Sequence, residues 1–402
     1  MNKNISALYK IAQKETRKII GLMSGTSLDG LDIALCEVSG AGENTAVKIL
    51  EFETINYTED IKTEIRKVFA KKTIDFQHFA LLNEWIGILH ANMVNNCLQK
   101  WNIRAQEVDL IASHGQTVLH APKFLHQQEK FPNATLQIGD GDHIAVKTGI
   151  ITLSDFRQKH VAAGGEGAPL AVYGDYILFG KKGENRIMLN MGGIANFTYL
   201  PASLNAEDVF VTDTGTANTL IDIYTKHYFP EKSYDKDAEI AQKGTVNQEL
   251  LTELKNDAFF TKSFPKTIGQ ELFNFEFVQK ALSKTNLTDI SASDLLATLT
   301  RLSAETIAEA ILFVVKNTGT PIEDFTIYMS GGGANNPLLV SWLKELLSCQ
   351  FQKSDDLGIS GDAKEAVLFA ILANETVAGG NYNFGANKGI PSVTMGKISF
   401  PD

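Results

Sequence analysis

Apolar and polar positions over the first part of the chain predict three strands followed by two helices. Apolar runs at 19–22 and 31–35 flank a turn rich in glycine and hydroxyl side chains, which is typical of two strands joined by a hairpin. Residues 47–55 alternate and predict a third strand. Residues 59–70 and 76–101 contain no proline and have helical periodicity, so we expect two helices there.

The second part of the chain repeats this order. Residues 186–190, 197–200 and 208–212 predict three strands around a glycine turn, and 219–229 predicts the helix that follows. A mostly helical region then extends from 237 to 317. Two β-β-β-α units predict an α/β fold with a ligand held at the junction of two domains.

Shorter segments complete this picture. Strands are expected at 108–113, 135–139 and 150–153. Residues 119–132 contain two prolines and predict a loop, and 213–218 predicts another loop after the last strand of the second unit.

Composition narrows the class of protein. The 402 residues are 44% apolar and 21% charged, which is the ordinary range of soluble globular proteins and long enough for two or three domains. The net charge of −10 argues against a nucleic-acid partner, because phosphate backbones attract basic surfaces. A small anion remains possible, since a local nest of N–H groups can hold it.

Three widely spaced cysteines, at 36, 97 and 349, argue against a disulfide scaffold or a structural zinc site. Reduced thiols fit a cytoplasmic protein. No stretch reaches the length of a membrane span, so no membrane partner is expected. Residues 1–17 lack the apolar core of a signal peptide and predict a short N-terminal extension.

Three glycine turns follow or precede buried strands, at 25–30, 192–193 and 331–333. None is a Walker loop or a G-x-G-x-x-G fingerprint. The third leads into a helix with a capping asparagine and Pro337 in its first turn, and such a helix start favours an anion. Together the turns favour nucleotide binding, although each taken alone also fits a hairpin tip that merely needs turn residues.

Nine motifs now bear on the family, and they occur in the order GLMSGTSLDGLD, SHGQT, TLQIGDGDHIA, DFR, GGEGAPL, LNMGGIAN, YDKDAE, SGGGANNPLL and GISGDAKEA. This set, from about residue 19 to the end, resembles the anhydro-N-acetylmuramic acid kinase family. The resemblance implies two ribonuclease-H-like domains of the actin, hexokinase and Hsp70 type, with a central cleft that closes over ATP and magnesium. We expect an N-terminal extension at 1–17, a first actin-like domain at 18–150 plus 379–402, and a second at 151–378 with a helical insertion.

The implied activity is that of an ATP-dependent sugar kinase of cell-wall recycling. Family members phosphorylate O6 of 1,6-anhydro-N-acetylmuramic acid while water opens the anhydro bridge, which gives N-acetylmuramic acid 6-phosphate. The resemblance also suggests a homodimer. Matching motif to motif, the implied cofactor-binding residues are Gly25, Thr26, Ser27, Leu28, Asp29, Gly30, Leu31, Asp32, Gly192, Gly193, Gly331, Gly332, Gly333 and Asn335.

The implied catalytic residues are Asp213 and Glu365. Asp213 matches the family's base, and Glu365 matches a glutamate at the sugar end of the site. A single base suits the reaction: the attacking water must lose a proton, whereas O6 departs onto phosphorus and needs no acid. Outside this motif, Asp213 would equally fit a turn or helix-capping residue. No cluster has metal-ligand spacing, so we expect Mg²⁺ to arrive with ATP and lie near Asp29.

Substrate-binding residues are expected at His114, Arg157, Gly165 and Asn218. Arg157 could pair with the lactyl carboxylate in two-pronged fashion, or it could brace the following loop. His114 is a candidate for the cleft, although a lone histidine is more often a packing or turn residue.

One loop departs from the family pattern. The family's D-T-G-P-G-N is Asp213-Thr214-Gly215-Thr216-Ala217-Asn218 here. Ala217 would cost about 1 kcal/mol or more if the loop required positive φ at that position. The departure leaves two alternatives open: a kinase of another 1,6-anhydro sugar such as levoglucosan, and a catalytically inactive nucleotide-binding protein.

Overall fold

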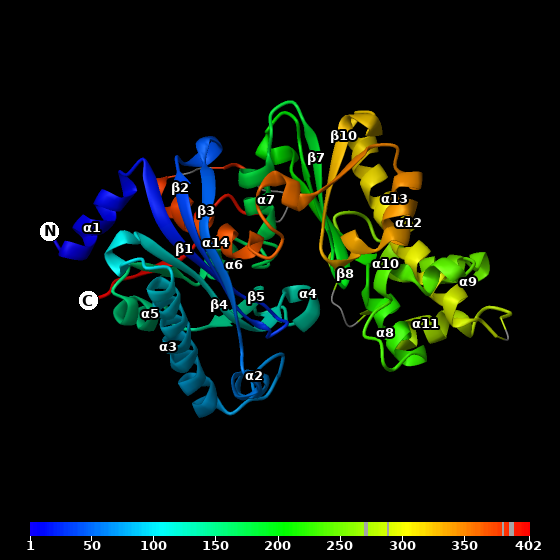
Figure 1. The fold of residues 1–402 in the computed structure, drawn as a ribbon, viewed down its shortest axis with the longest axis horizontal. Helices are drawn as coiled ribbons and strands as arrows, with labels where there is room; N and C mark the ends of the chain where they lie inside the picture. The colour runs from blue at the N-terminus through cyan, green and yellow to red at the C-terminus, as the bar shows by residue number, and fades with distance from the viewer. Residues whose placement is uncertain (269–271, 288, 380–381, 386–389) are drawn as a thin grey trace. The chain divides into compact units, whose positions relative to one another are not determined.

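The computed structural model describes residues 1–402 except 269–271, 288, 380–381 and 386–389 (Figure 1). The described strands form two sheets, and the chain divides into two compact units. Unit 1 consists of Met1–Leu178 and Asp362–Asp402, and unit 2 consists of Phe179–Gly361.

Unit 1 holds a seven-stranded sheet in the order β12-β6-β4-β1-β2-β3, with β5 paired to β4. Its strands are β1 (Thr16–Ser24), β2 (Gly30–Ser39), β3 (Ala46–Asn56), β4 (Leu110–Ala121), β5 (Ala134–Ile138), β6 (Thr152–Ser154) and β12 (Lys397–Ser399). Its helices are α1 (Lys3–Ala12), α2 (Glu59–Arg66), α3 (Phe76–Lys100), α4 (Lys123–His126), α5 (Gly141–Thr148), α6 (Phe156–Ala162), α7 (Ala171–Phe179) and α14 (Lys364–Ala378).

Unit 2 holds a five-stranded sheet in the order β11-β10-β7-β8-β9. Its strands are β7 (Asn185–Met191), β8 (Ile194–Leu200), β9 (Phe210–Thr216), β10 (Phe325–Ser330) and β11 (Gln350–Lys353). Its helices are α8 (Thr219–Tyr228), α9 (Gln248–Lys255), α10 (Ala258–Thr261), α11 (Phe275–Leu282), α12 (Ala292–Thr318) and α13 (Pro337–Leu346).

The two sheets share one topology. In each unit the first three strands form an antiparallel meander, and two later strands add in parallel beside the first. The order β3-β2-β1-β4-β6 in unit 1 therefore corresponds to the order β9-β8-β7-β10-β11 in unit 2. This repeat confirms the predicted α/β fold built from two ribonuclease-H-like β-β-β-α units.

The strand period places helices on both faces of the sheet in unit 1. Successive side chains of β1 point to opposite faces, so Ile20 and Leu22 join the core beneath α3 while Gly21 faces α14. A Cβ at Gly21 would collide with the carbonyl oxygen of Ala366, so glycine is what lets α14 lie against β1. In unit 2, Ile187 and Leu189 pack with the apolar face of α12 in the same way.

The compact units differ from the domain boundaries expected at 150/151 and 378/379. Residues 151–178 and 362–378 belong to unit 1, because β6 pairs with β4 and α14 packs on β1 and β2. The N-terminal extension contains a helix, α1, whose Asn4 side chain donates to Asp402 at 2.8 Å.

Two strands extend into segments that the sequence predicted to be loops. β4 continues through His114 and Gln116 to Ala121, because β5 pairs with it across a bulge, so the loop expected at 119–132 begins late. β9 continues to Thr216, which places Asp213 inside a strand opposite Asn196 rather than in a loop. Helices α5, α6 and α7 were not predicted.

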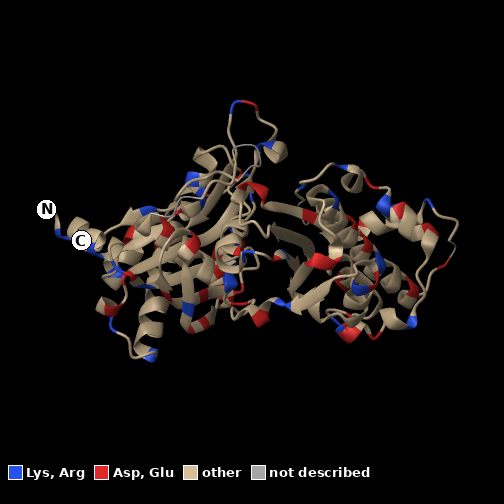
Figure 2. Ribbon diagram, turned by 90° about the horizontal axis from the view of Figure 1, so that it is seen from above, with Lys and Arg blue, Asp and Glu red and all other residues tan. Residues whose placement is uncertain are grey.

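Among the described residues, no helix combines the length and apolar composition needed to cross a membrane. Figure 2 shows that acidic and basic residues alternate along the ribbon of each unit rather than gathering in one segment.

Candidate active site

The turn between β1 and β2 carries most of the predicted phosphate-binding residues of unit 1. Thr26, Ser27 and Asp29 are exposed there. The side chains of Leu28 and Leu31 are buried in the core of unit 1, so these two residues can offer a ligand only their backbone groups. Leu28 has a positive φ of 60°, which turns the chain back toward β2.

A chain of buried hydrogen bonds holds this turn from behind. The Gln116 amide nitrogen donates to the Gly25 carbonyl at 2.9 Å, which leaves its oxygen to accept the Ser24 hydroxyl at 2.6 Å. The Tyr57 hydroxyl then donates to Ser24 Oγ at 3.0 Å. Because its one hydrogen is used there, the bond of 2.7 Å between Tyr57 and His90 Nε2 requires the tautomer in which Nε2 is the donor. Burial lowers the pKa of His90 to about 4, so the ring is neutral. The chain runs in one direction, from His90 to the turn.

Carboxylates gather near the same end of the sheet. Burial raises the pKa of Asp32, and the negative charges of Asp362 and Asp29 raise it further, while the Thr54 hydroxyl, which donates to Asp32 Oδ1 at 2.6 Å, opposes them. Mutual repulsion of this kind is relieved by a bound cation. The surroundings of Asp32 are thus acidic, but no group of three or more His, Cys, Asp or Glu side chains among the described residues is arranged to hold a metal ion.

Arg157 and His114, two of the predicted substrate-binding residues, are hydrogen-bonded to each other inside unit 1. Arg157 Nε donates to His114 Nε2 at 2.8 Å, and Nη1 donates to the Gly167 carbonyl at 2.6 Å. His114 Nδ1 bonds the Gly115 carbonyl at 2.8 Å, so both ring nitrogens are occupied and the ring is 2% exposed. Burial, and next the Arg157 charge, lower the pKa of His114 well below its usual value. The structure thus places His114 as the support of Arg157, with no nitrogen left for a sugar.

Glu365 lies in the first turn of α14, on an exposed position. Loss of solvation beside the surrounding protein raises the pKa of Glu365, and the positive charge of Arg157 opposes this shift. In turn, burial lowers the pKa of Arg157 to about 10 while the Glu365 charge raises it. The two predicted residues therefore influence one another within unit 1.

The loop after α6 is held by one side chain of that helix and by one from the segment before β5. His160 Nδ1 accepts the Gly167 N–H at 3.0 Å, and the Asn133 amide donates to the Gly165 carbonyl at 3.1 Å. A Cβ at Gly165 would overlap the His160 ring, so only glycine fits there. Gly165 consequently contributes to the site by shaping this loop.

In unit 2 the turn between β7 and β8 is fixed through its carbonyl oxygens. The Gly193 oxygen accepts the N–H groups of Ala217 at 2.8 Å and Thr219 at 3.2 Å. The Gly192 oxygen accepts the Asn218 N–H at 3.1 Å and the Asn218 side-chain amide at 2.7 Å. The predicted substrate residue Asn218 therefore joins β9 and α8 to this turn.

The third glycine turn lies against the same hairpin. Gly331 has φ of 79°, and a Cβ there would lie 2.7 Å from the Met191 carbonyl group. Asn335 accepts from Lys353 Nζ at 3.3 Å, and Asn336 caps α13 by accepting from Leu338 and Leu339, as the sequence predicted. Two of the three predicted glycine turns thus meet in unit 2, next to a helix N-terminus that favours an anion.

Asp213 sits on β9 beside these turns. Its carboxylate oxygen Oδ2 accepts the Ile268 N–H at 2.8 Å, and no hydrogen bond in the described part of the chain occupies Oδ1. Burial raises the pKa of Asp213 to about 6, and the Ile268 N–H opposes this shift. Such a carboxylate is ionised at neutral pH yet basic enough to take a proton, which is the profile of a general base.

Comparison with known proteins assigns this arrangement to a family. The family model described as anhydro-N-acetylmuramic acid kinase matches residues 17–398. The chain belongs to the anhydro-N-acetylmuramic acid kinase family. A curated member from Pseudoalteromonas atlantica is 53% identical over 405 residues, which cover all of both chains. Another, from Caldanaerobacter subterraneus, is 40% identical over 98% of this chain and 99% of its own.

Solved structures show more distant likenesses. An activator of 2-hydroxyisocaproyl-CoA dehydratase from Clostridium difficile with bound ADPNP is 11% identical, with a TM-score of 0.39, over 90% of this chain and 95% of its own. A hexokinase from Schistosoma mansoni complexed with glucose is 9% identical, with a TM-score of 0.36, over 90% and 86%.

The loop that departs from the family's D-T-G-P-G-N pattern does not require positive φ at its alanine. Among these residues only Gly215 has a positive φ, of 147°, and a Cβ there would lie 3.0 Å from the Phe260 ring. Ala217 is outside the positive region and fully buried. The strain that alanine would cause at a left-handed position therefore does not arise.

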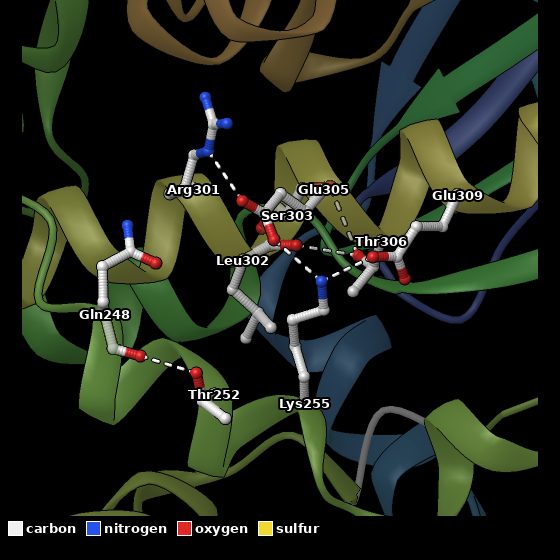
Figure 3. Close-up of polar contacts among 9 residues, drawn as sticks. All are labelled: Gln248, Thr252, Lys255, Arg301, Leu302, Ser303, Glu305, Thr306 and Glu309. Atoms are coloured by element: carbon white, nitrogen blue, oxygen red, sulfur yellow. Dashed lines mark hydrogen bonds and ion pairs between the residues drawn. The ribbon is translucent and has the colours of Figure 1, made fainter. Parts of the chain in front are cut away.

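Helix α12 supports this loop from the inside of unit 2. The buried Ser303 hydroxyl donates to the Ala217 carbonyl at 2.9 Å. Figure 3 shows how α12 is tied to α9: Lys255 Nζ lies 2.8 Å from Glu305 and 2.5 Å from Glu309, and Glu305 also accepts from Arg301 at 2.9 Å. The ion pairs hold the helix that carries Ser303.

Sequence reasoning missed several residues that shape these sites. Tyr57 and His90 stand in ordinary strand-end and helix positions and gave no signal. Lys266 and Ile268 follow a proline in a stretch without periodicity, although they hold Asp213. Gln116 lies in the SHGQT motif, and this motif could have indicated its role.

Proposed function

We propose that this chain phosphorylates O6 of 1,6-anhydro-N-acetylmuramic acid with ATP while water opens the anhydro ring. The products are N-acetylmuramic acid 6-phosphate and ADP, within the recycling of cell-wall sugars. Family membership supports the substrate and the reaction. The observation that carries the proposal is Asp213, a half-buried carboxylate with one oxygen engaged by Ile268 and a pKa of about 6.

Asp213 is proposed to act as the general base. Water that attacks the anomeric carbon must lose a proton, and a positioned carboxylate that takes it accelerates the step by about a hundredfold to ten-thousandfold. Oδ2 is fixed by the Ile268 N–H, so Oδ1 is the atom that receives the proton. The C1–O6 bond breaks as the new C1–O bond forms.

No second carboxylate is needed as an acid. Ordinary glycosidases protonate the leaving oxygen from a carboxylic acid. Here the leaving O6 bonds to the γ-phosphorus as the bond from phosphorus to the β,γ-bridging oxygen breaks, and ADP takes up the electron pair. Phosphoryl transfer of this kind depends on positioning and charge stabilisation.

Phosphate groups are proposed to be held by backbone N–H groups of the turns at 25–30, 192–193 and 331–333. Thr26 and Ser27 add exposed hydroxyls. Mg²⁺ bound with ATP would neutralise phosphate charge, and the negative charges of Asp29 and Asp362 near Asp32 favour a cation in this region. No cluster of three such side chains in the described part of the chain is arranged to hold a metal ion, so the ion would keep phosphate oxygens and waters as its main ligands.

The sugar is proposed to bind to unit 1. Arg157 uses Nε and Nη1 within the protein, and no hydrogen bond among the described residues occupies Nη2, so the guanidinium can still pair with the lactyl carboxylate. Glu365 is proposed to accept a sugar hydroxyl or amide proton. Glycine at 165 keeps the neighbouring loop in place.

The test is direct product analysis. Protein, MgATP and anhydro-N-acetylmuramic acid should yield the 6-phosphate and one ADP per sugar. A folded protein that gives no product above background would refute the proposal. A panel with levoglucosan tests the alternative substrate, and ATP binding without sugar-dependent ADP release would instead indicate an inactive nucleotide-binding protein.

Location and assembly stay predictions. Use of ATP supports a cytoplasmic location, where the nucleotide is available. The homodimer is tested by sedimentation velocity of the full chain.

A further inference from the structure

We propose that Lys266 is a positioning residue for the base: its buried ammonium fastens residues 264–268 beside β9, so that the Ile268 N–H meets the Asp213 carboxylate. This inference rests on the proposed role of Asp213. Lys266 itself touches no reacting atom in the proposed mechanism.

The ammonium of Lys266 has an unusual environment for a charged group. The side chain is 7% exposed, and Nζ donates to the carbonyl oxygens of Phe259 at 3.3 Å and Phe260 at 3.2 Å. Nζ also lies 4.8 Å from the ring centroid of Phe259 and 4.3 Å from that of Phe264. Burying an ammonium is unfavourable unless carbonyls and aromatic faces replace water, and here both kinds of partner are present.

The charged side chains near Lys266 do not replace the contacts of its ammonium group. Burial lowers the pKa of Lys266, the Glu309 carboxylate of α12 raises it and the Lys262 ammonium lowers it. Glu309 is already paired with Lys255 at 2.5 Å (Figure 3). The hydrogen bonds of the Lys266 ammonium therefore go to the main chain of 259–260, and they tie that segment to 264–268.

The main chain of Lys266 lies directly against the strand that carries the base. Its N–H donates to Thr212 Oγ1 at 3.0 Å, and its carbonyl accepts the Asp213 N–H at 2.9 Å. Two residues later, the Ile268 N–H donates to Asp213 Oδ2 at 2.8 Å. The ammonium, the strand pairing and the carboxylate bond thus belong to one short segment.

This segment also affects proton affinity. The influences on the Asp213 pKa are burial, which raises it, and the Ile268 N–H, which lowers it. A donor aimed at a carboxylate favours its ionised form. If the segment loosens, the donor moves away, the pKa of Asp213 rises further, and a larger share of the enzyme is protonated at neutral pH.

The experiment compares Lys266→Met, Lys266→Arg and the matched control Lys262→Met, which removes an exposed lysine four residues away. The readouts are kcat/KM for the anhydro sugar against pH, KM for ATP, Tm, and the Asp213 carboxyl titration by carbon-detected NMR. For Lys266→Met we expect the acid limb and the NMR titration to move upward by about one pH unit, with KM for ATP unchanged. Lys266→Arg should restore most of the profile, and Lys262→Met should match the parent.

An unchanged titration in Lys266→Met would overturn the inference, and so would an equal shift in Lys262→Met. If Lys266→Met does not fold, Ile268→Pro removes the N–H itself and should give the same upward shift. The NMR readout needs no turnover, so it separates the two proposals: a parent protein that makes no product refutes the proposed function, whereas an unmoved Asp213 titration refutes the role of Lys266.

Discussion

The two hairpins that begin the sheets occupy equivalent places in their units, yet they are fixed in different ways. The turn between β1 and β2 is held by side chains, through the bonds from His90, Tyr57 and Ser24 to Gln116. The turn between β7 and β8 is held mainly by backbone donors, the N–H groups of Ala217–Thr219, with one side-chain donor, the Asn218 amide.

The two turns should therefore be sensitive to different kinds of substitution. A turn held by side-chain hydroxyls should respond to the loss of one oxygen atom. A turn held by main-chain contacts should respond to an added Cβ, because backbone groups cannot move aside as a flexible side chain can. The same glycine-rich signal in the sequence therefore corresponds to two kinds of sensitivity.

The largest effect is expected at Asp213, the base that β9 places beside the second hairpin. Asp213→Asn keeps an acceptor oxygen for the Ile268 N–H but cannot take a proton at neutral pH, so kcat should fall by about a thousandfold. ATP affinity should stay within about twofold of the parent, because Asp213 is not assigned to the nucleotide. The measurements are product formation and ATP titration by calorimetry.

The pH dependence of kcat/KM is a second test of Asp213 as the base. The base must be ionised, and burial raises the pKa of Asp213 to about 6. The kcat/KM for the sugar should therefore be constant above this value and fall as pH drops through it, by about tenfold per pH unit. Asp29→Asn, in the first hairpin, should weaken the Mg²⁺ dependence and leave this acid limb in place. If Asp29→Asn abolished the acid limb instead, the base would lie in the first hairpin and its assignment to Asp213 would be wrong.

The next effect tests the main-chain contact of the second hairpin. Gly331→Ala places a Cβ 2.7 Å from the Met191 carbonyl group at a φ of 79°. Strain of this kind costs about 1–3 kcal/mol, so the Kd for ATP should rise by about fivefold to 150-fold if the strain is relieved in the unbound protein. The matched control is Gly332→Ala, whose Cβ would lie 3.7 Å from its nearest neighbour and should change the Kd little. Equal weakening by both variants would contradict the proposed contact.

A smaller effect is expected from removing one oxygen behind the first hairpin. Tyr57→Phe leaves Ser24 and His90 without their shared partner, at a cost of about 1–3 kcal/mol in the free energy of unfolding. The turn also loses its support, so KM for ATP should rise by about fivefold. In Tyr199→Phe, the matched change on β8, the lost bond goes to Asn185, outside the turn. That variant should lower Tm and leave KM for ATP unchanged; an equal rise in KM would remove the distinction between the hairpins.

The sequence was informative where a pattern is local. Alternation and glycine turns predicted both meanders, because burial of one face of a strand leaves its period in the chain. The extension of β4 through His114–Thr117 was missed, because a glycine among polar residues reads as a turn while pairing with β5 depends on distant residues. Asp213 was placed in a loop for the same reason: its partner on β8, Asn196, lies seventeen positions earlier.

The supports of the candidate site could not be predicted in this way. Lys266 reads as a loop lysine after a proline, and its burial arises from Phe259, Phe260 and Phe264 folding around it. Helix α7 is apolar on most sides and has no period to detect. By contrast, motifs singled out Asp213, Arg157 and the glycine turns as candidates, since chemistry restricts the residue types more tightly than packing does.

The smallest effect is expected where the chain departs from its family. Ala217→Gly restores the family's glycine beside the second hairpin, but Ala217 is outside the positive-φ region and fully buried. Glycine therefore relieves no strain and adds freedom to the unfolded chain, so the free energy of unfolding should fall by about 1 kcal/mol. The Ala217 N–H and carbonyl keep their bonds to Gly193 and Ser303, and kcat/KM should stay within about twofold of the parent. A large gain in turnover with a higher Tm would show that alanine strains this loop. The response of the second hairpin to substitution would then depend on the backbone conformation of this loop and not on the contacts described above.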